Sequence, residues 1–333
     1  MGLSLLRHRE RVIGMAKIIV TGAAGFIGSH LCEELLRNHQ HDVVGIDAFI
    51  DLSTPTWIRK RNLQHLLENP RFTFFEDNLL TVPWEQILHE ADVVYHLAGM
   101  PGVRSSWGPD FVHYTDHNIT ATQRLLEGCK QHGIKRFLFA STSSIYGEKS
   151  GKVDESATTF PLSPYGITKL TSEHLCRVYY ENDGLPVVIL RFFTVYGPRQ
   201  RPDMAFHRFI KQMFDREEIT LYGDGTQSRD FTYISDCVRA VVAAGFADEV
   251  IGETINIGGK ERATINECIA LLEHLFQYKA SIKVAGGIYG EPTSTWADIT
   301  KAERLLGYSP AIDLETGLLL EIEHLKKLYQ YVK

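Results

Sequence analysis

The stretch Thr21–Gly28 reads TGAAGFIG and stands between a short apolar run and a segment whose apolar residues have helical spacing. Gly22 permits a tight turn, Gly25 lets the backbone approach a pyrophosphate, and Gly28 lets the helix pack closely on the strand. An anion at such a turn meets the N–H groups of the helix N-terminus. The G-x-x-G-x-x-G spacing therefore predicts a dinucleotide-binding turn, and a glycine turn that binds nothing is the alternative.

Apolar runs alternate with helical patterns around this turn and through the first half of the chain. Such alternation is typical of a parallel sheet covered by helices on both faces. The sequence predicts strands at Lys17–Thr21, Asp42–Asp47, Phe72–Phe75, Asp92–Ala98, Arg136–Ser141 and Pro186–Phe192, and helices near 26–38, 84–90, 109–132 and 164–183. We therefore expect an α/β fold with a doubly wound, Rossmann-type parallel sheet.

The second half of the chain has a different pattern. After about residue 193, turn-rich segments such as GPRQRPD, GDGTQSRD and NIGGKERAT separate shorter elements, and a last amphipathic helix is predicted from about residue 314. We expect a Rossmann domain over residues 16–192 and a smaller α/β substrate-binding lobe over residues 193–333, with the chain free to cross between the two lobes. Residues 1–15 form a tail to which no role is assigned.

Composition excludes several classes of function. The chain has 333 residues, 44% of them hydrophobic, so it can bury a large core. Its formal charge of −6 gives no overall attraction for nucleic acid or an anionic membrane, and no apolar run is long enough to span a bilayer. Its five cysteines are widely scattered, without a C-x-x-C pair or a nearby histidine cluster. We expect a cytoplasmic protein with no metal site.

Asp47 ends the second predicted strand, about twenty residues after the glycines. An acid at this position accepts hydrogen bonds from the adenosine ribose hydroxyls of a dinucleotide. No Arg or Lys follows it before Arg59, so a ribose 2′-phosphate would be repelled without compensation. The sequence therefore predicts NAD rather than NADP, and a solvated acid that caps the strand is the alternative.

Tyr165 and Lys169 lie four residues apart, just after Pro164, at the start of a predicted helix. They share one helix face. An ammonium group beside a phenol favours the phenolate and provides a general base near operating pH. Taken alone, such a pair is also typical of a solvated helix face.

Several motifs in order decide between these interpretations. TGAAGFIG, HLAG (96–99), STSSIYG (141–147), Y-x-x-x-K, RFFTVYGP and GDGTQSRDF closely resemble the extended short-chain dehydrogenase/reductase family, in its branch of nucleotide-sugar epimerases and dehydratases. The resemblance extends from about residue 16 to about residue 330 and implies a homodimer formed by the two long helices. It also implies NAD contacts from Gly22, Gly25, Phe26, Ile27, Gly28, Asp47, Asn78, Leu97, Ala98, Tyr165 and Lys169.

The resemblance also implies the catalytic roles. Tyr165 corresponds to the general base, Lys169 to its partner and a ribose contact, and Thr142 to the hydroxyl residue that binds the sugar 4-hydroxyl. Asn78 stands where an Asp commonly contacts adenine, and its amide oxygen can still accept that hydrogen bond.

Two arginines are candidates for substrate binding outside this triad. Arg229 corresponds to a residue that grips the substrate diphosphate, as its place beside a glycine-rich turn suits; a surface ion pair with Asp230 or Asp236 is the alternative. Arg104 follows the fourth strand and is either a substrate contact or an ordinary loop charge. Residues 286–298 lack the Arg that usually provides a second diphosphate contact in the family.

The end of the fifth strand indicates the reaction. It reads Thr142-Ser143-Ser144, whereas the family's 4,6-dehydratases have Thr-Asp-Glu and its uronate decarboxylases have Thr-Ser-Glu. A site without those acids suits oxidation at C4 and return of the hydride better than elimination of water. The resemblance therefore predicts a 4-epimerase.

The segment 194–205, TVYGPRQRPDMA, indicates the sugar. UDP-glucose epimerases usually have Asn where Thr194 stands, and the run Arg201–Ala205 resembles UDP-glucuronate 4-epimerases. Arg201, Thr194 and the three hydroxyls of residues 142–144 would receive a carboxylate; an arginine in solvent is the alternative. Rival functions are a UDP-glucuronate decarboxylase, a UDP-glucose or UDP-N-acetylhexosamine 4-epimerase, and an NAD-binding regulator without activity.

Overall fold

The computed structural model describes residues 14–37, 41–50, 53–287 and 289–331. Its main sheet has seven strands in the order β10-β6-β5-β4-β1-β2-β3, and the pairings along it are all parallel. The strands are β1 (Ala16–Thr21), β2 (His41–Asp47), β3 (Phe72–Glu76), β4 (Val93–His96), β5 (Arg136–Thr142), β6 (Val187–Phe192) and β10 (Thr254–Ile257). The strand order reverses between β1 and β4, and ligands bind at such a point in doubly wound folds.

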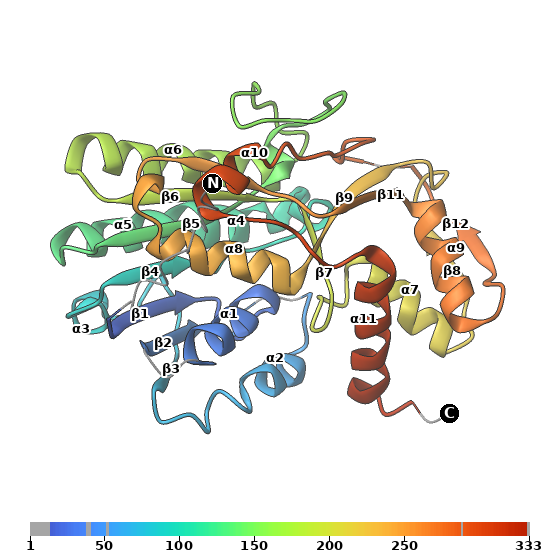
Figure 1. Cartoon of the computed structure of the whole chain (residues 1–333), viewed down its shortest axis with the longest axis horizontal. Coiled ribbons are helices and arrows are strands. Elements are labelled where there is room, and N and C mark those ends of the chain that lie inside the picture. The colour runs from blue at the N-terminus through green and yellow to red at the C-terminus, as the bar shows by residue number, and fades with distance from the viewer. Residues whose placement is uncertain (1–13, 38–40, 51–52, 288, 332–333) are drawn as a thin grey trace, which may run out of the picture.

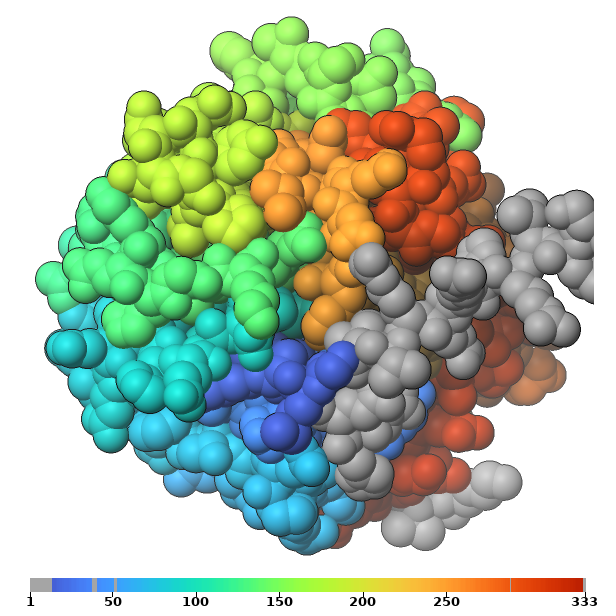
Figure 2. All heavy atoms as spheres, turned by 60° about the vertical axis from the view of Figure 1, so that its left-hand side comes forward, coloured from blue at the N-terminus to red at the C-terminus, as the bar shows by residue number. Residues whose placement is uncertain are grey.

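Helices cover the main sheet on both sides (Figure 1). Alternate residues of β1 point to opposite faces, so Ile18 and Val20 join one core and Ile19 the other. The first core includes residues of α1 (Phe26–Arg37) and α8 (Ile234–Phe246), and the second includes residues of α5 (Ala121–Gln131) and α6 (Pro164–Asp183). Figure 2 shows α5 in green and α6 in yellow-green, side by side on one face of the molecule. Other helices along these layers are α2 (Thr56–Leu63), α3 (Trp84–Leu88), α4 (Phe111–Tyr114) and α10 (Thr300–Leu306).

A smaller group of elements lies beside the carboxyl ends of the strands (Figure 1). It contains a three-stranded sheet of β11 (Glu261–Thr264), β9 (Ser228–Tyr233) and β7 (Thr194–Tyr196). A two-stranded sheet joins β12 (Ile282–Val284) to β8 (Ile219–Leu221). The helices here are α7 (Ala205–Phe214), α9 (Ile265–Phe276) and α11 (Leu314–Leu328).

The doubly wound α/β fold predicted from the sequence is confirmed, and the six predicted strands and four predicted helices are present. Two boundaries differ. β4 ends at His96, two residues before the predicted end, and the Leu97 N–H makes the last bond of its pairing with β1, to the Thr21 carbonyl at 3.3 Å. The predicted helix 109–132 is divided between α4 and α5 by a π-helical segment, Thr115–Thr120.

Between residue 193 and α11 the sequence predicted only short, unassigned elements; in the main sheet and its first-half helices, the unpredicted elements are the helix α2 and the strand β10. β10 pairs in parallel with β6, so the chain returns to the main sheet after the smaller lobe has begun. The division into residues 16–192 and 193–333 therefore stays a prediction, with a crossing of the chain at β10. The predicted tail falls largely on residues 1–13, which lie outside the described residues.

Candidate active site

The β1–α1 turn depends on its glycines for steric reasons. Gly22 has a φ of 74°, and a Cβ placed on it would lie 2.9 Å from the Ala98 nitrogen. A Cβ on Gly28 would lie 2.1 Å from the Gly22 carbonyl oxygen. Both positions therefore require glycine, and the turn leaves the N-terminus of α1 open toward a pocket lined by Gly22, Gly25 and Gly28. This cradle of backbone fits the pyrophosphate of a dinucleotide.

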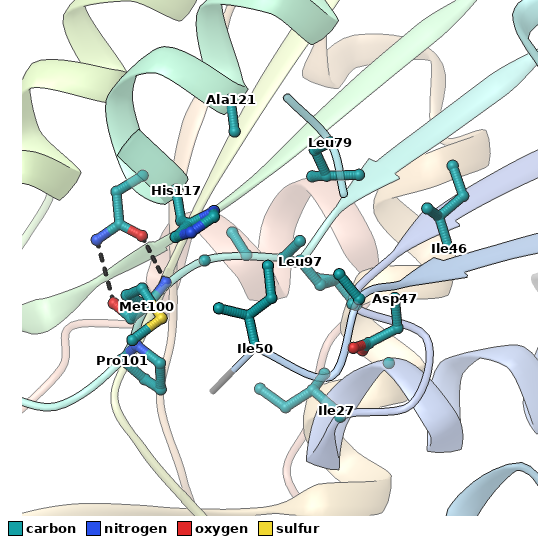
Figure 3. Close-up of a pocket in the computed structure, with 18 of the residues that line it drawn as sticks. Ile27, Ile46, Asp47, Ile50, Leu79, Leu97, Met100, Pro101, His117 and Ala121 are labelled. Carbon is teal, nitrogen blue, oxygen red and sulfur yellow. Dashed lines mark hydrogen bonds between the residues drawn. The ribbon is translucent and has the colours of Figure 1, made fainter. Parts of the chain in front are cut away.

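The pocket runs along the carboxyl ends of β1, β2 and β4. Figure 3 shows Ile27 and Asp47 toward one end and Met100, Pro101 and His117 toward the other. Every residue predicted to contact the cofactor lines it: Gly22, Gly25, Phe26, Ile27, Gly28, Asp47, Asn78, Leu97, Ala98, Tyr165 and Lys169. The fold thus brings together eleven positions spread over almost 150 residues of the chain, from Gly22 to Lys169.

Asp47 is buried at the end of β2 and is held by three donors. Its Oδ2 accepts from the Ala24 N–H at 3.2 Å, and its Oδ1 accepts from the Phe49 N–H at 2.9 Å. The third donor is Arg59, whose Nη1 lies 3.1 Å from the same Oδ1. Burial raises the pKa of Asp47, and Arg59 opposes that shift. From the sequence, no Arg or Lys was expected beside Asp47, since none follows it before Arg59; this was wrong, because α2 brings the Arg59 guanidinium into contact with Asp47.

Asn78 lies at the edge of the pocket, where a contact with adenine was predicted. Its side-chain oxygen accepts from the Leu80 N–H at 3.0 Å. An amide oxygen has two lone pairs, so this bond leaves one for a ligand. The neighbouring Asp77 also lines the pocket, although sequence reasoning did not select it.

Tyr165 and Lys169 project from the first turns of α6 into the same pocket. α6 begins where it does because Pro164 occupies its first turn and the Ser163 hydroxyl accepts from the Gly166 N–H at 3.1 Å. Burial raises the pKa of Tyr165, while Arg201 and a hydrogen bond with Thr142 act to lower it. Burial also lowers the pKa of Lys169, to about 8.

The hydroxyl cluster forms a tight turn at the end of β5. Ser143–Ile145 is a 3-10 helix whose N-cap is Thr142. The Thr142 Oγ1 accepts from the Ser144 N–H at 3.2 Å and also lies 3.2 Å from the Ser144 Oγ. Thr142 is buried, whereas Ser143 and Ser144 are half-buried. Thr194 begins β7 and is half-buried too.

Arg201 reaches this pocket from the loop after β7. Its Nε and Nη2 donate to the two carboxylate oxygens of Asp203, at 3.0 and 2.9 Å. This two-bond contact fixes the plane of the guanidinium. Arg201 lines the same pocket as Tyr165, and its positive charge acts to lower the pKa of the Tyr165 phenol. It is therefore not simply an arginine in solvent.

Arg104 and Arg229 form a second group, outside the lining of the cofactor pocket. Both contact Glu291: the Arg104 Nε lies 3.2 Å and the Arg229 Nη2 lies 3.0 Å from its carboxylate oxygens. The guanidinium carbon of Arg104 also lies 3.9 Å from the centroid of the Tyr222 ring. Arg229 was expected to pair, if at all, with Asp230 or Asp236, and its ion pair is with Glu291 instead.

Sequence reasoning missed several residues of both groups. Glu291 lies in the very segment that lacks the family's usual Arg. The guanidinium carbon of Arg208, on α7, lies 5.2 Å from the centroid of the Tyr222 ring. Arg104 contacts the same ring. Asn118 donates to the Met100 carbonyl at 3.1 Å and accepts from the Met100 N–H at 2.7 Å (dashed lines at Met100 in Figure 3), which fixes a loop in the pocket lining. The sequence offered no signal for Asn118 beyond its place in a helical pattern.

Within the described ranges, no group of three or more His, Cys, Asp or Glu side chains is arranged to hold a metal ion. None of the helices in that part of the chain is long and apolar enough to cross a membrane.

Comparison with known proteins gives consistent results along nearly the whole chain. A Bacillus subtilis (strain 168) protein described as the uncharacterized UDP-glucose epimerase YtcB is 58% identical over 314 residues, which is 94% of this chain and 99% of that protein. The UDP-glucuronate 4-epimerase of Thermodesulfobacterium geofontis (strain OPF15) is 38% identical over 324 residues, which is 96% and 99% of the two chains.

The same holds for solved structures. A Bacillus cereus UDP-glucuronic acid 4-epimerase in complex with UDP-glucuronic acid and NAD is 55% identical and superposes with a TM-score of 0.93, covering 94% of this chain and 100% of that one. The NAD dependent epimerase/dehydratase family matches residues 18–258. These findings confirm the predicted family and its cofactor, NAD. This chain belongs to the NAD dependent epimerase/dehydratase family.

Proposed function

We propose that the protein converts UDP-glucuronate to UDP-galacturonate by epimerisation at C4, without loss of carbon dioxide. One observation carries the proposal: Arg201 lies in the same pocket as Tyr165, and the strand end that bears Thr142 continues with two serines and no acid. A guanidinium and several hydroxyls suit a sugar carboxylate. The relative that binds UDP-glucuronic acid and NAD supports the same substrate.

When bound, NAD would supply reversible hydride transfer at C4 of the sugar and end unchanged, so the net reaction is not a redox change. Tyr165 accepts the proton of the 4-hydroxyl, and the Thr142 hydroxyl, which hydrogen-bonds to Tyr165, orients that group. Lys169 lies one helical turn further along the same face and favours the phenolate. The proton returns from Tyr165 when the sugar presents its other face.

The two groups of substrate residues suggest how the sugar turns. We infer that Arg229 and Arg104 hold the diphosphate, which stays in place while the flat 4-keto sugar rotates about it. These arginines converge on one carboxylate, that of Glu291, at 3.0 and 3.2 Å. Two guanidinium groups that share an anion in this way suit a diphosphate.

A 4-keto uronate is a β-keto acid, and it loses carbon dioxide easily when the bond to the carboxylate lies parallel to the carbonyl π orbitals. Arg201, Thr194 and the hydroxyls of residues 142–144 would hold that bond away from overlap. The contacts that select the substrate would therefore also protect the intermediate. Asp203 supports this role because it fixes the orientation of Arg201 through two hydrogen bonds.

The first test is incubation of the purified protein with UDP-glucuronate and NAD⁺, followed by proton NMR of the anomeric signals. We expect signals of UDP-galacturonate to appear. Formation of UDP-xylose instead would show that the protein is a decarboxylase. Turnover of UDP-glucose with none of UDP-glucuronate would favour the second candidate, a neutral UDP-hexose 4-epimerase.

That second candidate has an observation of its own, because the relative at 58% identity is described as a UDP-glucose epimerase. No turnover of any UDP-sugar in a panel would indicate an NAD-binding protein without this activity.

We place the reaction in the cytoplasm, as expected for free thiols and a nucleotide-sugar substrate.

The protective role of the carboxylate contacts has a separate test. We expect both Arg201→Ala and Ser144→Glu to release more carbon dioxide from UDP-glucuronate than the unaltered protein does. The substitution Asp203→Asn leaves Arg201 in place and removes only the charge that orients it, so it should release less carbon dioxide than Arg201→Ala but more than the unaltered protein. Equal release of carbon dioxide from all four proteins would contradict the protective role.

A further inference from the structure

A second cavity, of about 280 Å³, lies between α1, α2, α11 and the loop that follows β7. It shares no lining residue with the cofactor pocket. Three cations line it from three elements: Arg61 of α2, Arg199 of the loop and Lys327 of α11. None of its described lining residues is acidic. We call it the basic cavity.

Arg61 and Lys327 supply the net positive charge of the basic cavity. Neither forms an ion pair with a carboxylate of the residues that the structure describes. Arg199 differs, because its Nη2 lies 2.6 Å from the Glu33 Oε1 and its charge is balanced there. Two unbalanced cations that line one cavity repel each other, and an anion bound between them would replace that repulsion with attraction.

His324, half-buried on α11, shows that these charges act on the interior of the cavity. Burial lowers its pKa most, and the positive charges of Arg199, Arg61 and Lys327 lower it further, to about 4. The imidazole is therefore neutral at ordinary pH and still has one N–H to donate. The cavity thus offers an anion two cations and a neutral donor.

The loop after β7 forms one wall of the basic cavity and continues into the active site. The Gly197 N–H donates to the Glu321 Oε2 of α11 at 2.9 Å, and the His30 Nε2 of α1 donates to the Pro198 carbonyl at 2.9 Å. A few residues later, Arg201 lines the cofactor pocket. A ligand in the basic cavity would therefore join α2 and α11 beside the loop that carries Arg201.

We propose that the basic cavity binds a small phosphate anion with more than one negative charge, of the size of inorganic diphosphate. Arg61 and Lys327 come from different helices and so suit an anion with several charged oxygens. The volume of about 280 Å³ lies just below the usual range of ligand pockets, so a whole dinucleotide would not fit. The phosphate end of a nucleotide has the same chemistry as free diphosphate.

Calorimetry with inorganic diphosphate tests the site. The protein is first saturated with NAD⁺ and UDP, so that diphosphate cannot bind where these nucleotides place their own phosphates. We expect one diphosphate per chain, and a dissociation constant raised roughly 10-fold or more in the double variant Arg61→Gln, Lys327→Gln. Both side chains are exposed, so the variant should fold, and its melting temperature without ligand checks this. A parallel titration with CTP identifies the source: tighter binding than diphosphate at the same site would indicate a nucleotide.

The double variant Lys60→Gln, Lys326→Gln is the matched control. It removes the same charge from the same two helices, at positions outside the lining of the cavity. Its affinity for diphosphate should equal that of the unaltered protein. Diphosphate should also raise the melting temperature of the unaltered and control proteins, but not that of the cavity variant, because only a ligand that binds the folded state stabilises it.

Three outcomes would overturn the proposal: no binding of diphosphate to the unaltered protein, equal weakening in both double variants, or no weakening in either. Equal weakening would mean that diphosphate responds only to the overall charge of the surface. None of these measurements depends on which sugar the enzyme uses.

Discussion

Tyr165 illustrates how surroundings set the reactivity of one side chain. Burial raises the pKa of its phenol, which disfavours the phenolate that a general base needs. Arg201 and the hydrogen bond with Thr142 act in the opposite direction, and the positive charge of the nicotinamide would add to them. Lys169 contributes from the same helix face, with a pKa lowered to about 8 by burial. The phenolate form of Tyr165 is therefore stabilised by positively charged groups from different parts of the chain.

Removal of the phenolic oxygen tests this role directly. We expect Tyr165→Phe to lower kcat by roughly 10²–10⁴, which is the usual contribution of a positioned general base. NAD⁺ binding should be kept, because the ring itself remains in place. Calorimetry with NAD⁺ and a coupled assay of sugar epimerisation measure the two quantities. A variant that retains more than half of its activity would show that another group takes the proton.

The effect of Arg201 on Tyr165 can be read from the pH profile. Because Arg201 lowers the pKa of Tyr165, its loss should raise that pKa, and the acid limb of the profile should move to higher pH. We expect this shift for Arg201→Met in a plot of log kcat/KM against pH. Asp203→Asn keeps the guanidinium and should shift the limb less. An unchanged limb in Arg201→Met would indicate that the arginine acts only in binding.

At the scale of single residues, the sequence selected positions but not the contacts that they make. Asp47 was selected from its place after the second strand, yet its partner Arg59 was not, because the contact depends on how α2 folds back. The same is true of Arg229, whose partner Glu291 lies 62 residues further along the chain. Local spacing carries no information about such contacts.

Elements follow the sequence where their pattern is apolar and regular. The continuous apolar run of β1 predicted a strand covered on both faces, and its side chains do divide between two cores. The helix α2 could not be predicted from the sequence, because its buried face includes Arg59 and Asn62 and the segment therefore lacks an apolar stripe. β10 has only four residues and finds its place beside β6 from far along the chain. Elements whose position depends on contacts with distant parts of the chain, such as α2 and β10, were therefore not predicted.

The β1–α1 turn is the element on which cofactor binding most depends. We expect Gly28→Ala to abolish measurable NAD⁺ binding, because its Cβ would lie 2.1 Å from the backbone oxygen of Gly22 and the helix would have to move. Gly287→Ala is the matched control, since a Cβ at Gly287 has nothing within 4 Å. Calorimetry with NAD⁺ measures the effect. Normal binding in the Gly28 variant would show that the turn can adjust.

A buried ion pair connects α6 to β6 beneath the catalytic face. Arg191 donates to Glu173 through Nε at 3.0 Å and Nη2 at 2.8 Å, and both side chains are nearly inaccessible to solvent. Loss of one partner leaves a buried charge, so we expect Arg191→Met to lower the free energy of unfolding by about 3–5 kcal/mol. Denaturant titration measures this.

The matched variant combines Arg191→Met with Glu173→Leu. It removes both charges and should be less destabilised than Arg191→Met alone, although Arg191 also donates to the Tyr146 hydroxyl at 2.8 Å. Equal destabilisation of the two variants would mean that the cost comes from lost packing and not from an unpaired carboxylate.

The whole molecule exposes apolar side chains on the helices that the family resemblance assigns to dimerisation. Val112 on α4 is 52% exposed, and Ile167 and Val178 on α6 are 52% and 51% exposed. The two residues of α6 are about three turns apart and so lie on one face of the helix. α4 and α6 also contact each other. Exposure of several large apolar groups together is typical of a protein–protein interface.

We therefore predict a homodimer that buries this surface. Light scattering after size exclusion should give twice the chain mass of 37.7 kDa for the unaltered protein. The double substitution Ile167→Arg and Val178→Arg should give a monomer, because two charged groups on each copy cannot be desolvated at the interface. Leu67→Arg places a charge at an exposed leucine, 58% accessible and outside both helices, and should leave the dimer intact. A monomeric unaltered protein, or a dimer that survives the α6 substitutions, would show that these apolar groups do not form the interface.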